Sequence, residues 1–472
     1  MRFALFLAAA IALAAGVAHA EPVKVALPQG VLAGIGDGKV ESFKGIPYAA
    51  PPVGPLRWKP PQAPAHWSGE RDASQFGASC LQAAPLRNVP PESPGAKFSE
   101  DCLTLNVWAP AGAKKAPVMV WLHGGGNTAG SSADRFMDGS GFARDGVILV
   151  SLNYRLGALG FLAHPGFEGA NFGLWDQVAA LRWVKANIAR FGGDPANVTL
   201  FGESAGGEDV IALMTAGPAK GLFQKAIVES GGGGWGGEPD LAQARAAGSK
   251  LLDGLVPAGG TIRDIPAEKL AALESWDIGV AVDGALLKAQ PMAAFAAGQA
   301  AKLPLIIGTN QQEGSLDADD GDPAKVWPDR LDADDLAALR ADYGPAAADD
   351  RAFAQILFRD GYFAGPARWL AQQSGGWLYR FDYIYSYLRS RRTGAQHGSE
   401  IPFVFDRWRA ETAEDQGVTA AMHGAWVQFA KTGKVGWRPF NDGGEWMVFD
   451  ASPSARPVSD PAALDLLQSR LK

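Results

Sequence analysis

The segment FGESAGG, residues 201–207, places Ser204 two residues from a glycine on either side. An apolar, strand-like stretch precedes it at residues 198–200, and a segment with helical character follows it. A G-x-S-x-G pattern in this context predicts a sharp turn from strand to helix, with the serine hydroxyl projecting clear of the sheet. Gly202 and Gly206 are expected there because a Cβ at either position would collide with the neighbouring strand or helix. With 59 glycines in the chain, the pattern alone carries little weight, so the surrounding elements decide its meaning.

Strand and helix signals alternate along the 472 residues. Short, continuous apolar runs at residues 118–122 and 147–152 are typical of strands buried on both faces of a parallel sheet. Apolar residues recur at helical spacing over residues 174–191, and the glycines that follow end that helix. Further strands are predicted at residues 303–307 and 377–385. The pattern predicts a single α/β domain over residues 21–472, with a large, mostly parallel central sheet flanked by helices.

The N-terminus has the pattern of an export signal. Met1 and Arg2 precede an apolar run to about residue 17, and Ala18-His19-Ala20 is a small-x-small cleavage site. We therefore expect residues 1–20 to be a cleaved signal peptide and the mature chain to begin at Glu21, in the periplasm or outside the cell. The apolar run is shorter than the roughly 20 residues that cross a bilayer, and no later stretch predicts a membrane span.

Cys80 and Cys102 are the only cysteines. In an oxidising compartment such a pair is expected to form a disulfide, which by closing a loop of about 20 residues contributes roughly 3 kcal/mol in the chain-entropy model. Neither cysteine lies in a C-x-x-C pattern, and no nearby histidine suggests zinc. The formal net charge of -7, without a cluster of Lys and Arg, argues against a nucleic-acid partner.

A second glycine motif follows the predicted strand at residues 118–122. His123 is followed by Gly124, Gly125 and Gly126. Backbone N–H groups in such a run can approach a tetrahedral intermediate closely and stabilise its oxyanion. A phosphate-binding loop is the rival interpretation, but no Gly-Lys-Ser/Thr follows. The N–H of Ala205, next after the serine, is the expected third donor.

The expected chain order of catalytic side chains in this kind of sheet is serine, acid, histidine. Two histidines follow Ser204. His423 lies in a helical pattern, which favours a structural role, whereas His397 lies in a turn-rich loop and is the predicted base. Glu313 follows the predicted strand at residues 303–307 and is the predicted acid. The alternative acids, which are interpreted as a solvated loop, are Asp317, Asp319, Asp320 and Asp322.

Several longer segments resemble one known family. They are FKGIPYAAPPVGPLRW at residues 43–58, EDCLTLNVW at 100–108, NYRLGALGF at 153–161, the run at 171–207 that contains the serine turn, GTNQQEGS at 308–315, HGSEIPFVF at 397–405 and WVQFAKTG at 426–433. The chain resembles the type-B carboxylesterases, which include cholinesterases and para-nitrobenzyl esterases. The resemblance implies an α/β-hydrolase fold and hydrolysis of small-molecule esters without a metal or organic cofactor.

The resemblance also implies individual roles. It makes Ser204 the nucleophile, Glu313 the acid and His397 the base. The implied oxyanion donors are Gly125, Gly126 and Ala205, and the implied disulfide joins Cys80 to Cys102. Glu203 resembles a buried glutamate that supports the histidine, and Ser230 a serine linked to the same network. Both also have a simpler interpretation, as buried polar groups satisfied by the serine turn.

Some positions depart from the family pattern. The loop between the cysteines contains no Trp, so the choline-recognising aromatic of cholinesterases has no counterpart there. Asn127 stands where many relatives have an aromatic residue, and Glu208 and Asp209 stand where small or hydroxyl residues are common. These departures predict a more polar pocket mouth, and Trp235 is expected either to shape the acyl pocket or to pack in the core.

Two alternatives from other functional classes remain open at this level. An amidase, carbamate hydrolase or thioester hydrolase on the same fold would share the triad. A non-catalytic binding relative would lack one triad member, and this chain has all three.

Overall fold

The computed structural model describes residues 21–83, 97–232, 235, 237–273, 278–316, 322–327, 329–407 and 411–471. The predicted signal peptide, residues 1–20, lies outside the described residues, so its cleavage stays a prediction.

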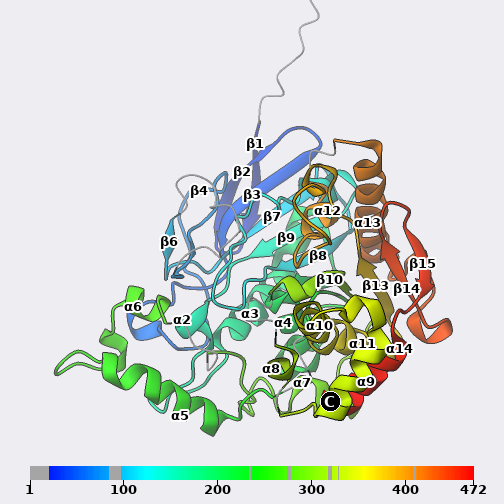
Figure 1. Ribbon diagram of the computed structural model, residues 1–472. Helices are drawn as coiled ribbons and strands as arrows, with labels where there is room; N and C mark the ends of the chain where they lie inside the picture. Colours follow the sequence, from blue (N-terminus) through cyan, green and yellow to red (C-terminus); the bar gives the residue numbers. More distant parts are fainter. Residues whose placement is uncertain are drawn as a thin grey trace, which may run out of the picture.

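One large mixed sheet runs through the molecule (Figure 1). Its central strands, in the order in which they pair, are β9 (Ile148–Leu152), β8 (Ala116–Leu122), β10 (Gly193–Glu203), β11 (Lys225–Glu229), β12 (Leu305–Asn310), β13 (Trp377–Phe381) and β14 (Glu445–Phe449). All of these neighbours pair in parallel. They carry continuous apolar runs because helices cover both of their faces. The predicted parallel sheet is therefore confirmed in its centre.

The two ends of the sheet are antiparallel. The strands at the N-terminal end are β1 (Glu21–Leu27), β2 (Gly30–Gly36), β3 (Val40–Pro47) and β7 (Thr104–Pro110), and β15 (Ser454–Pro457) closes the other end. Short strands outside this path are β4 (Glu70–Asp72), β5 (Ser79–Cys80) and β6 (Phe98–Ser99). In Figure 1 the blue N-terminal strands and the orange-red C-terminal strands lie at opposite ends of the sheet.

Helices pack on both faces of the sheet. One face carries α3 (Phe172–Asn187), α4 (Ala205–Thr215), α11 (Gly365–Ser374) and α14 (Pro461–Leu471), which share a core that includes Leu174, Leu213, Leu370 and Leu467. The other face carries α1 (Ser140–Arg144), α12 (Ile401–Val404) and α13 (Ala413–Thr432), with Phe142, Phe403 and Trp426 in a separate core. The remaining helices are α2 (Gly157–Phe161), α5 (Leu241–Leu252), α6 (Ala267–Ala271), α7 (Pro291–Ala296), α8 (Pro323–Val326), α9 (Ala333–Tyr343) and α10 (Asp350–Phe358).

Predicted and observed element ends differ where tertiary pairing sets them. The predicted helix at 174–191 is α3 continued by a 3-10 turn, η2 (Ile188–Phe191), and Gly192 ends it in the left-handed region at φ 81°. The strand predicted at 377–385 ends at Phe381, because Phe381 is the last residue paired on both sides, with Asn310 of β12 and Phe449 of β14. A strand continues only as far as its neighbours offer hydrogen bonds.

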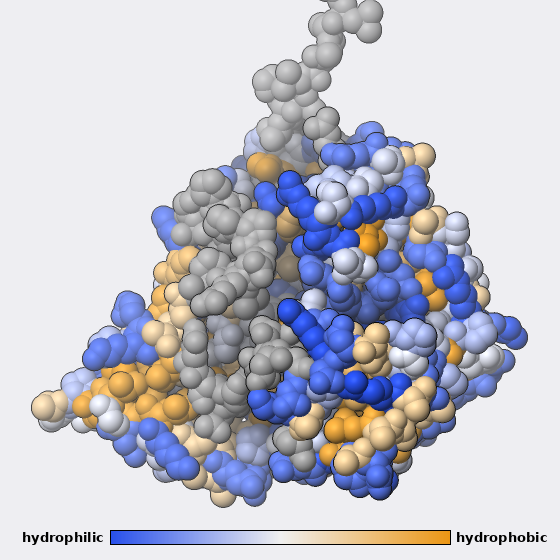
Figure 2. All heavy atoms as spheres, in the orientation of Figure 1, coloured by the Kyte–Doolittle hydropathy of each residue, from blue (hydrophilic) through white to orange (hydrophobic). Residues whose placement is uncertain are grey.

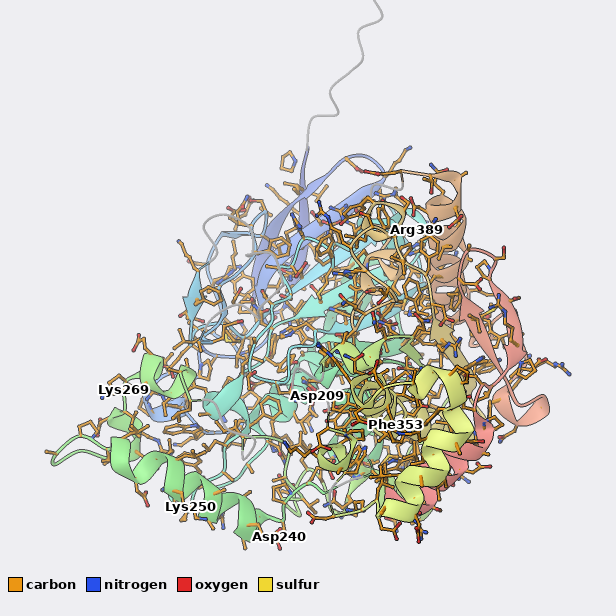
Figure 3. The ribbon with its side chains drawn as sticks, viewed as in Figure 1. Asp209, Asp240, Lys250, Lys269, Phe353 and Arg389 are labelled. Atoms are coloured by element: carbon orange, nitrogen blue, oxygen red, sulfur yellow. A yellow bond between two sulfur atoms is a disulfide. The ribbon has the colours of Figure 1, made fainter. Side chains whose placement is uncertain are left out.

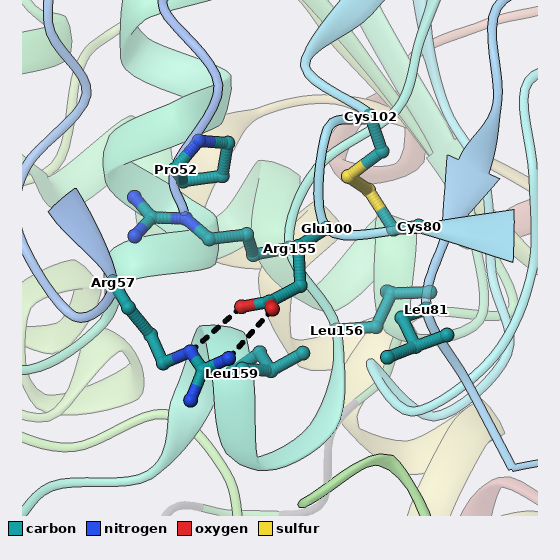
Figure 4. A pocket seen from close by; sticks show the side chains of 9 residues that line it. All are labelled: Pro52, Arg57, Cys80, Leu81, Glu100, Cys102, Arg155, Leu156 and Leu159. Atoms are coloured by element: carbon teal, nitrogen blue, oxygen red, sulfur yellow. Dashed lines mark hydrogen bonds and ion pairs between the residues drawn. A yellow bond between two sulfur atoms is a disulfide. The ribbon is translucent and has the colours of Figure 1, made fainter. Parts of the chain in front are cut away.

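The predicted disulfide is present between Cys80 and Cys102 (Figure 4). Beside it, the Arg57 guanidinium donates from Nε and Nη2 to the two oxygens of Glu100 at 2.7 and 2.6 Å. Arg57 Nη1 also donates to the Ile265 carbonyl at 2.8 Å. Because bidentate Arg–carboxylate pairs fix both partners, this contact ties the disulfide loop to a segment far along the chain.

Figure 2 shows apolar residues gathered at the left of this view, over α5 and α6, and polar residues over much of the right half. Partly buried apolar side chains from that part of the chain, including Leu251, Leu255 and Ile262, pack against the main core. In the described part of the chain, none of the helices combines the length and the apolar character that crossing a membrane requires.

Candidate active site

The serine turn lies between β10 and α4. Ser204 has φ 57° and ψ −129°, a conformation that costs energy for a residue with a side chain and that concentrates at functional turns. Its N–H donates to the Glu229 carbonyl of β11 at 2.8 Å. A Cβ on Gly206 would lie 2.3 Å from the Leu122 carbonyl oxygen, and one on Gly202 would lie 2.5 Å from that of Gly206. The predicted steric reason for both glycines is therefore confirmed.

The glycine run leaves β8 and approaches the serine closely. A Cβ on Gly124 would lie 3.0 Å from the Cβ of Ser204 and 2.5 Å from Glu203 Oε2. Gly125 adopts φ 112°, which side chains rarely tolerate, and a Cβ there would lie 2.2 Å from the Ala129 carbonyl oxygen. Only glycine fits this loop at so short a distance from the serine.

Gly125, Gly126 and Ala205, the residues whose N–H groups are the predicted oxyanion donors, line the same cavity as Ser204. Among the described residues, none of the three donates to a protein acceptor. Unpaired N–H groups at a helix start and in a glycine loop form an anion-binding arrangement. The structure thus places the predicted oxyanion donor residues and the serine in the lining of one cavity.

His397 precedes α12 and contacts two carboxylates. Its Nδ1 lies 2.6 Å from Oε2 of Glu313, which is fully buried, and its Nε2 lies 3.1 Å from Oε1 of Glu203. The Ser204 hydroxyl has no hydrogen-bond partner in the part of the chain that is described. The structure therefore brings the predicted base and acid into contact and places the predicted nucleophile in the same cavity, without a direct Ser–His bond.

Charge around His397 shifts its proton affinity. Burial lowers the pKa of the imidazole, but the negative charges of Glu203 and Glu313 outweigh it and raise the pKa above its ordinary value. Burial in turn raises the pKa of Glu203 to about 7, although the His397 charge opposes the shift. An imidazolium at this position is stabilised by both carboxylates.

A hydrogen-bond network holds Glu313 in place. Its Oε1 accepts from the Ser230 hydroxyl at 2.6 Å, from the Asn310 N–H at 2.7 Å and from the Thr309 hydroxyl at 3.0 Å. With Oε2 facing His397, the carboxylate has no freedom to rotate. Glu313 belongs to η6 (Glu313–Leu316), a short 3-10 turn after β12.

Glu400 is a member of this network that the sequence analysis did not single out. It is fully buried, accepts from the Ser230 hydroxyl at 3.4 Å and from the Asn310 side-chain amide, and contacts the network from the start of α12. Burial, followed by the charge of Glu203, raises its pKa to about 8. Its signal in the sequence is an acidic residue three positions after His397, inside the segment HGSEIPFVF.

The other candidates do not join the site. Asp317, Asp319 and Asp320 lie outside the described residues, and Asp322 is exposed and caps α8. His423 is buried on α13, where its Nδ1 lies 2.6 Å from the Val404 carbonyl and its Nε2 lies 3.1 Å from Asp145 Oδ2. Those contacts accord with the structural role predicted for it.

The cavity over Ser204 has a volume of about 1420 Å³. One part of its wall is aromatic and acidic, with Trp235, Tyr362, Glu208 and Glu238. Trp235 also packs edge-on against Trp369, at 6.1 Å between ring centroids. It therefore lines the cavity and also packs in the hydrophobic core. The lining also includes three arginines, Arg135, Arg392 and Arg407.

The three residues that depart from the family pattern, Asn127, Glu208 and Asp209, do not all line the cavity. Glu208 and Asn127 line the cavity, as the predicted polar pocket mouth requires. Asp209 does not, because it is fully buried, faces away from the cavity and bonds to Asn127 and Gln177. The expectation that Asp209 belongs to the mouth is wrong, since a residue one position after Glu208 on a helix points about 100° away from it.

A hydroxyl on a strained turn, an imidazole held by a buried carboxylate and free N–H groups in one cavity are the parts used by serine hydrolases. Within the described residues there is no group of three or more His, Cys, Asp or Glu side chains that could hold a metal ion.

Comparisons with known proteins agree on the class. A model of the carboxylesterase family matches residues 21–343 and 346–455. The fumonisin B1 esterase of Sphingopyxis macrogoltabida is 35% identical in an alignment 471 residues long, and the alignment covers 88% of this chain and 84% of that protein. The para-nitrobenzyl esterase of Bacillus subtilis is 37% identical over 457 residues, covering 88% of this chain and 91% of that protein. A solved structure of PNB esterase gives a TM-score of 0.82 at 33% identity, and the match covers 95% of this chain and 99% of that chain.

The fold and the matches define a carboxylic ester hydrolase with the α/β-hydrolase fold. The chain belongs to the carboxylesterase family.

Proposed function

We propose that this enzyme hydrolyses small-molecule carboxylic esters through Ser204, Glu313 and His397, by way of an acyl-enzyme. The observation that carries the proposal is the 2.6 Å contact between His397 Nδ1 and the buried Glu313 carboxylate, in the cavity that Ser204 lines. A buried carboxylate on Nδ1 fixes the tautomer in which Nε2 accepts a proton.

In this mechanism Nε2 of His397 takes the proton of the Ser204 hydroxyl as the oxygen attacks the ester carbonyl. The N–H groups of Gly125, Gly126 and Ala205 donate to the oxyanion that forms, each typically worth about 10²- to 10³-fold in rate. His397 then protonates the leaving alcohol. In the second half of the reaction, His397 takes a proton from a water molecule that attacks the acyl-enzyme, and it returns the proton to Ser204 as the acid leaves. The Ser–His hydrogen bond that this requires commonly tightens only when substrate is bound.

Glu203 and Ser230 have supporting roles in the proposal. Glu203 faces Nε2 of His397 at 3.1 Å, so its charge stabilises the imidazolium that forms during attack. Ser230 donates to Glu313 and holds the carboxylate toward Nδ1. Neither residue touches the reacting atoms of the ester in this scheme, so both act through the triad.

The test is hydrolysis of a p-nitrophenyl ester series by the wild-type enzyme and by Ser204→Ala. The variant is expected to lose about 10⁶-fold in kcat, because the nucleophile and base act as a unit. Retention of more than a trace of activity by pure Ser204→Ala would rule out Ser204 as the nucleophile. Within the same series, the chain length that gives the highest kcat/KM identifies the preferred acyl group.

Matched amide, carbamate and thioester substrates of the same acyl group separate the alternatives. An ester rate well above the other three supports a carboxylesterase. An amide rate equal to the ester rate would favour an amidase on the same fold, because ester and amide leaving groups differ strongly in the protonation they need.

We also propose that the enzyme acts outside the cytoplasm. The signal-like sequence at residues 1–20 and the disulfide between Cys80 and Cys102 support export. N-terminal sequencing of the protein from its host's periplasm or medium is expected to begin at Glu21, and an intact Met1 would contradict the proposal.

A further inference from the structure

Two side chains that depart from the family pattern bond to each other at the cavity wall: Asn127, which lines the cavity, and Asp209, which does not. Asn127 Nδ2 donates to Asp209 Oδ1 at 3.0 Å. Both are buried, with exposed fractions of 6% for Asn127 and 0% for Asp209. Asp209, labelled in Figure 3, projects near the centre of the molecule. The mechanism above uses neither side chain.

The surrounding groups leave this pair one arrangement. The second oxygen of Asp209, Oδ2, accepts from Gln177 Nε2 at 2.5 Å, so both carboxylate oxygens face amide donors. Asn127 Oδ1 lies 3.1 Å from the Tyr154 hydroxyl, whose single hydrogen is shared with the His123 carbonyl at 2.7 Å. A flipped Asn127 amide would turn its oxygen toward the carboxylate, which is why its orientation is fixed.

The two residues belong to the two separate segments that supply the oxyanion donors. Asn127 directly follows Gly126 in the glycine loop, and its own carbonyl accepts from the Gly157 N–H at 2.7 Å. Asp209 lies on α4, one helical turn after Ala205. The Asn127–Asp209 bond therefore spans from the loop after β8 to the helix after β10.

We propose that Asn127 and Asp209 are positioning residues that fix the N–H groups of Gly125 and Gly126 relative to that of Ala205. This proposal rests on the proposed function, since it concerns the oxyanion donors of that mechanism. A shift of about 1 Å in a catalytic group can cost about 10²-fold in rate, so a bond between the two donor segments affects turnover directly.

A purely structural role for Asn127 is the competing explanation. Asn127 adopts φ 55°, a left-handed conformation in which asparagine is favoured over most residues. The chain contains a matched control in Asn171, which adopts φ 57°, is fully buried and bonds through its side chain to both backbone groups of Ala281, at 2.8 and 2.9 Å. Asn171 does not line the cavity.

The experiment compares Asn127→Gly with Asn171→Gly. Glycine keeps the left-handed backbone accessible and removes only the side-chain bonds. The measurements are kcat and KM for a p-nitrophenyl ester, Tm, and the inhibition constant of a trifluoromethyl ketone. The serine attacks the carbonyl of this ketone, and the resulting hemiketal carries an oxyanion. A transition-state analogue reports the oxyanion donors selectively, whereas KM reports ground-state binding.

Asn127→Gly is expected to lower kcat by about 10-fold or more, to weaken the ketone by a similar factor and to change KM by less than about 2-fold. Asn171→Gly is expected to lower Tm without changing kcat or the ketone affinity. Equal kcat and ketone affinity in Asn127→Gly and the wild type would overturn the proposal, as would equal losses in the two glycine variants.

Asp209→Ala is the second variant, useful if Asn127→Gly does not fold. It removes both acceptor oxygens, so the bond from Asn127 is lost and a loss of kcat in the same direction is expected. In the double variant the losses are expected to be less than additive, because both changes break the same bond. Fully additive losses would contradict the proposal. Activity of Ser204→Ala is a separate readout, so failure of the triad and failure of this positioning role are distinguishable.

Discussion

Two histidines follow the serine turn, His397 partly buried and His423 buried, and the oxygens around their rings differ. His397 and His423 each have one ring nitrogen at 2.6 Å and the other at 3.1 Å from an oxygen. For His397 the closer oxygen is the carboxylate of Glu313, which is fully buried. For His423 the closer oxygen is a backbone carbonyl, and its carboxylate partner, Asp145, is 52% exposed on its side chain.

A histidine–carboxylate contact therefore does not by itself identify the base of the proposed mechanism. His397 lines the cavity and its partner Glu313 is fully buried, so in that mechanism a positive charge that forms on the ring is stabilised beside the substrate. His423 joins α13 to the segment before β9, and its position between the two elements makes it a structural contact.

The largest expected effect tests which carboxylate matters. Glu313→Gln keeps the shape of the side chain but removes the charge and the fixed tautomer of His397, so kcat is expected to fall about 10⁴-fold. Asp145→Asn makes the same change at His423 and is expected to leave kcat within about 2-fold. Steady-state kinetics on one p-nitrophenyl ester compares the two variants. Similar losses in both would show that the difference between the histidines has been misjudged.

The prediction of intermediate size concerns Glu203, the second carboxylate that contacts His397. The charge of Glu203 raises the pKa of the His397 imidazole, and the proposed mechanism needs the neutral ring to accept the serine proton. In the wild type, kcat/KM is therefore expected to rise with pH, and the midpoint of that rise is expected above 6.5, the ordinary pKa of histidine. Glu203→Gln removes that charge and is expected to move the midpoint to lower pH. A pH–rate profile with an unchanged midpoint would argue against electrostatic support from Glu203.

The smallest expected effect concerns a carboxylate in the cavity near His397. Burial, followed by the charge of Glu238, raises the pKa of Glu208 to about 7, so Glu208 is mostly neutral at pH 6 and charged at pH 8. A charged Glu208 repels a negatively charged ester. At pH 8, Glu208→Gln is expected to raise the kcat/KM of p-nitrophenyl hemisuccinate relative to p-nitrophenyl butyrate by about 3- to 10-fold.

The same ratio measured at pH 6 is the control for Glu208→Gln, because the wild-type side chain has then lost most of its charge. An equal gain at both pH values would point to a change of cavity shape and not of charge.

The features that were predictable from the sequence are those with local causes. The serine turn needs small residues at Gly202 and Gly206, and the oxyanion loop needs glycine at positions that no side chain fits. Continuous apolar runs mark strands covered on both faces, so the runs at residues 118–122, 147–152 and 303–307 predicted β8, β9 and β12, whereas β11 and β14 were not predicted. Each of these signals is contained in a short window of the chain.

The features that were not predictable depend on residues far apart in the chain. Asp209 is near the cavity in sequence but points into the core, and its amide partners come from the oxyanion loop and from α3. Glu400 joins the site only because Ser230, directly after β11, and Asn310, at the end of β12, contact it. The last residue of β13 is likewise set by where its two neighbouring strands end.

The contact between Glu313 and His397 also has a consequence for the order of folding. It joins residues 84 positions apart, after β12 and before α12, so it closes a long loop in a parallel sheet. Contacts of high sequence separation form slowly, because loop-closure entropy must be overcome before they contribute stability. The serine turn and the glycine loop involve β8, β10 and β11, which all precede β12 in the chain. In the proposed mechanism, catalysis therefore requires the second half of the sheet, so turnover of an ester reports the completed fold.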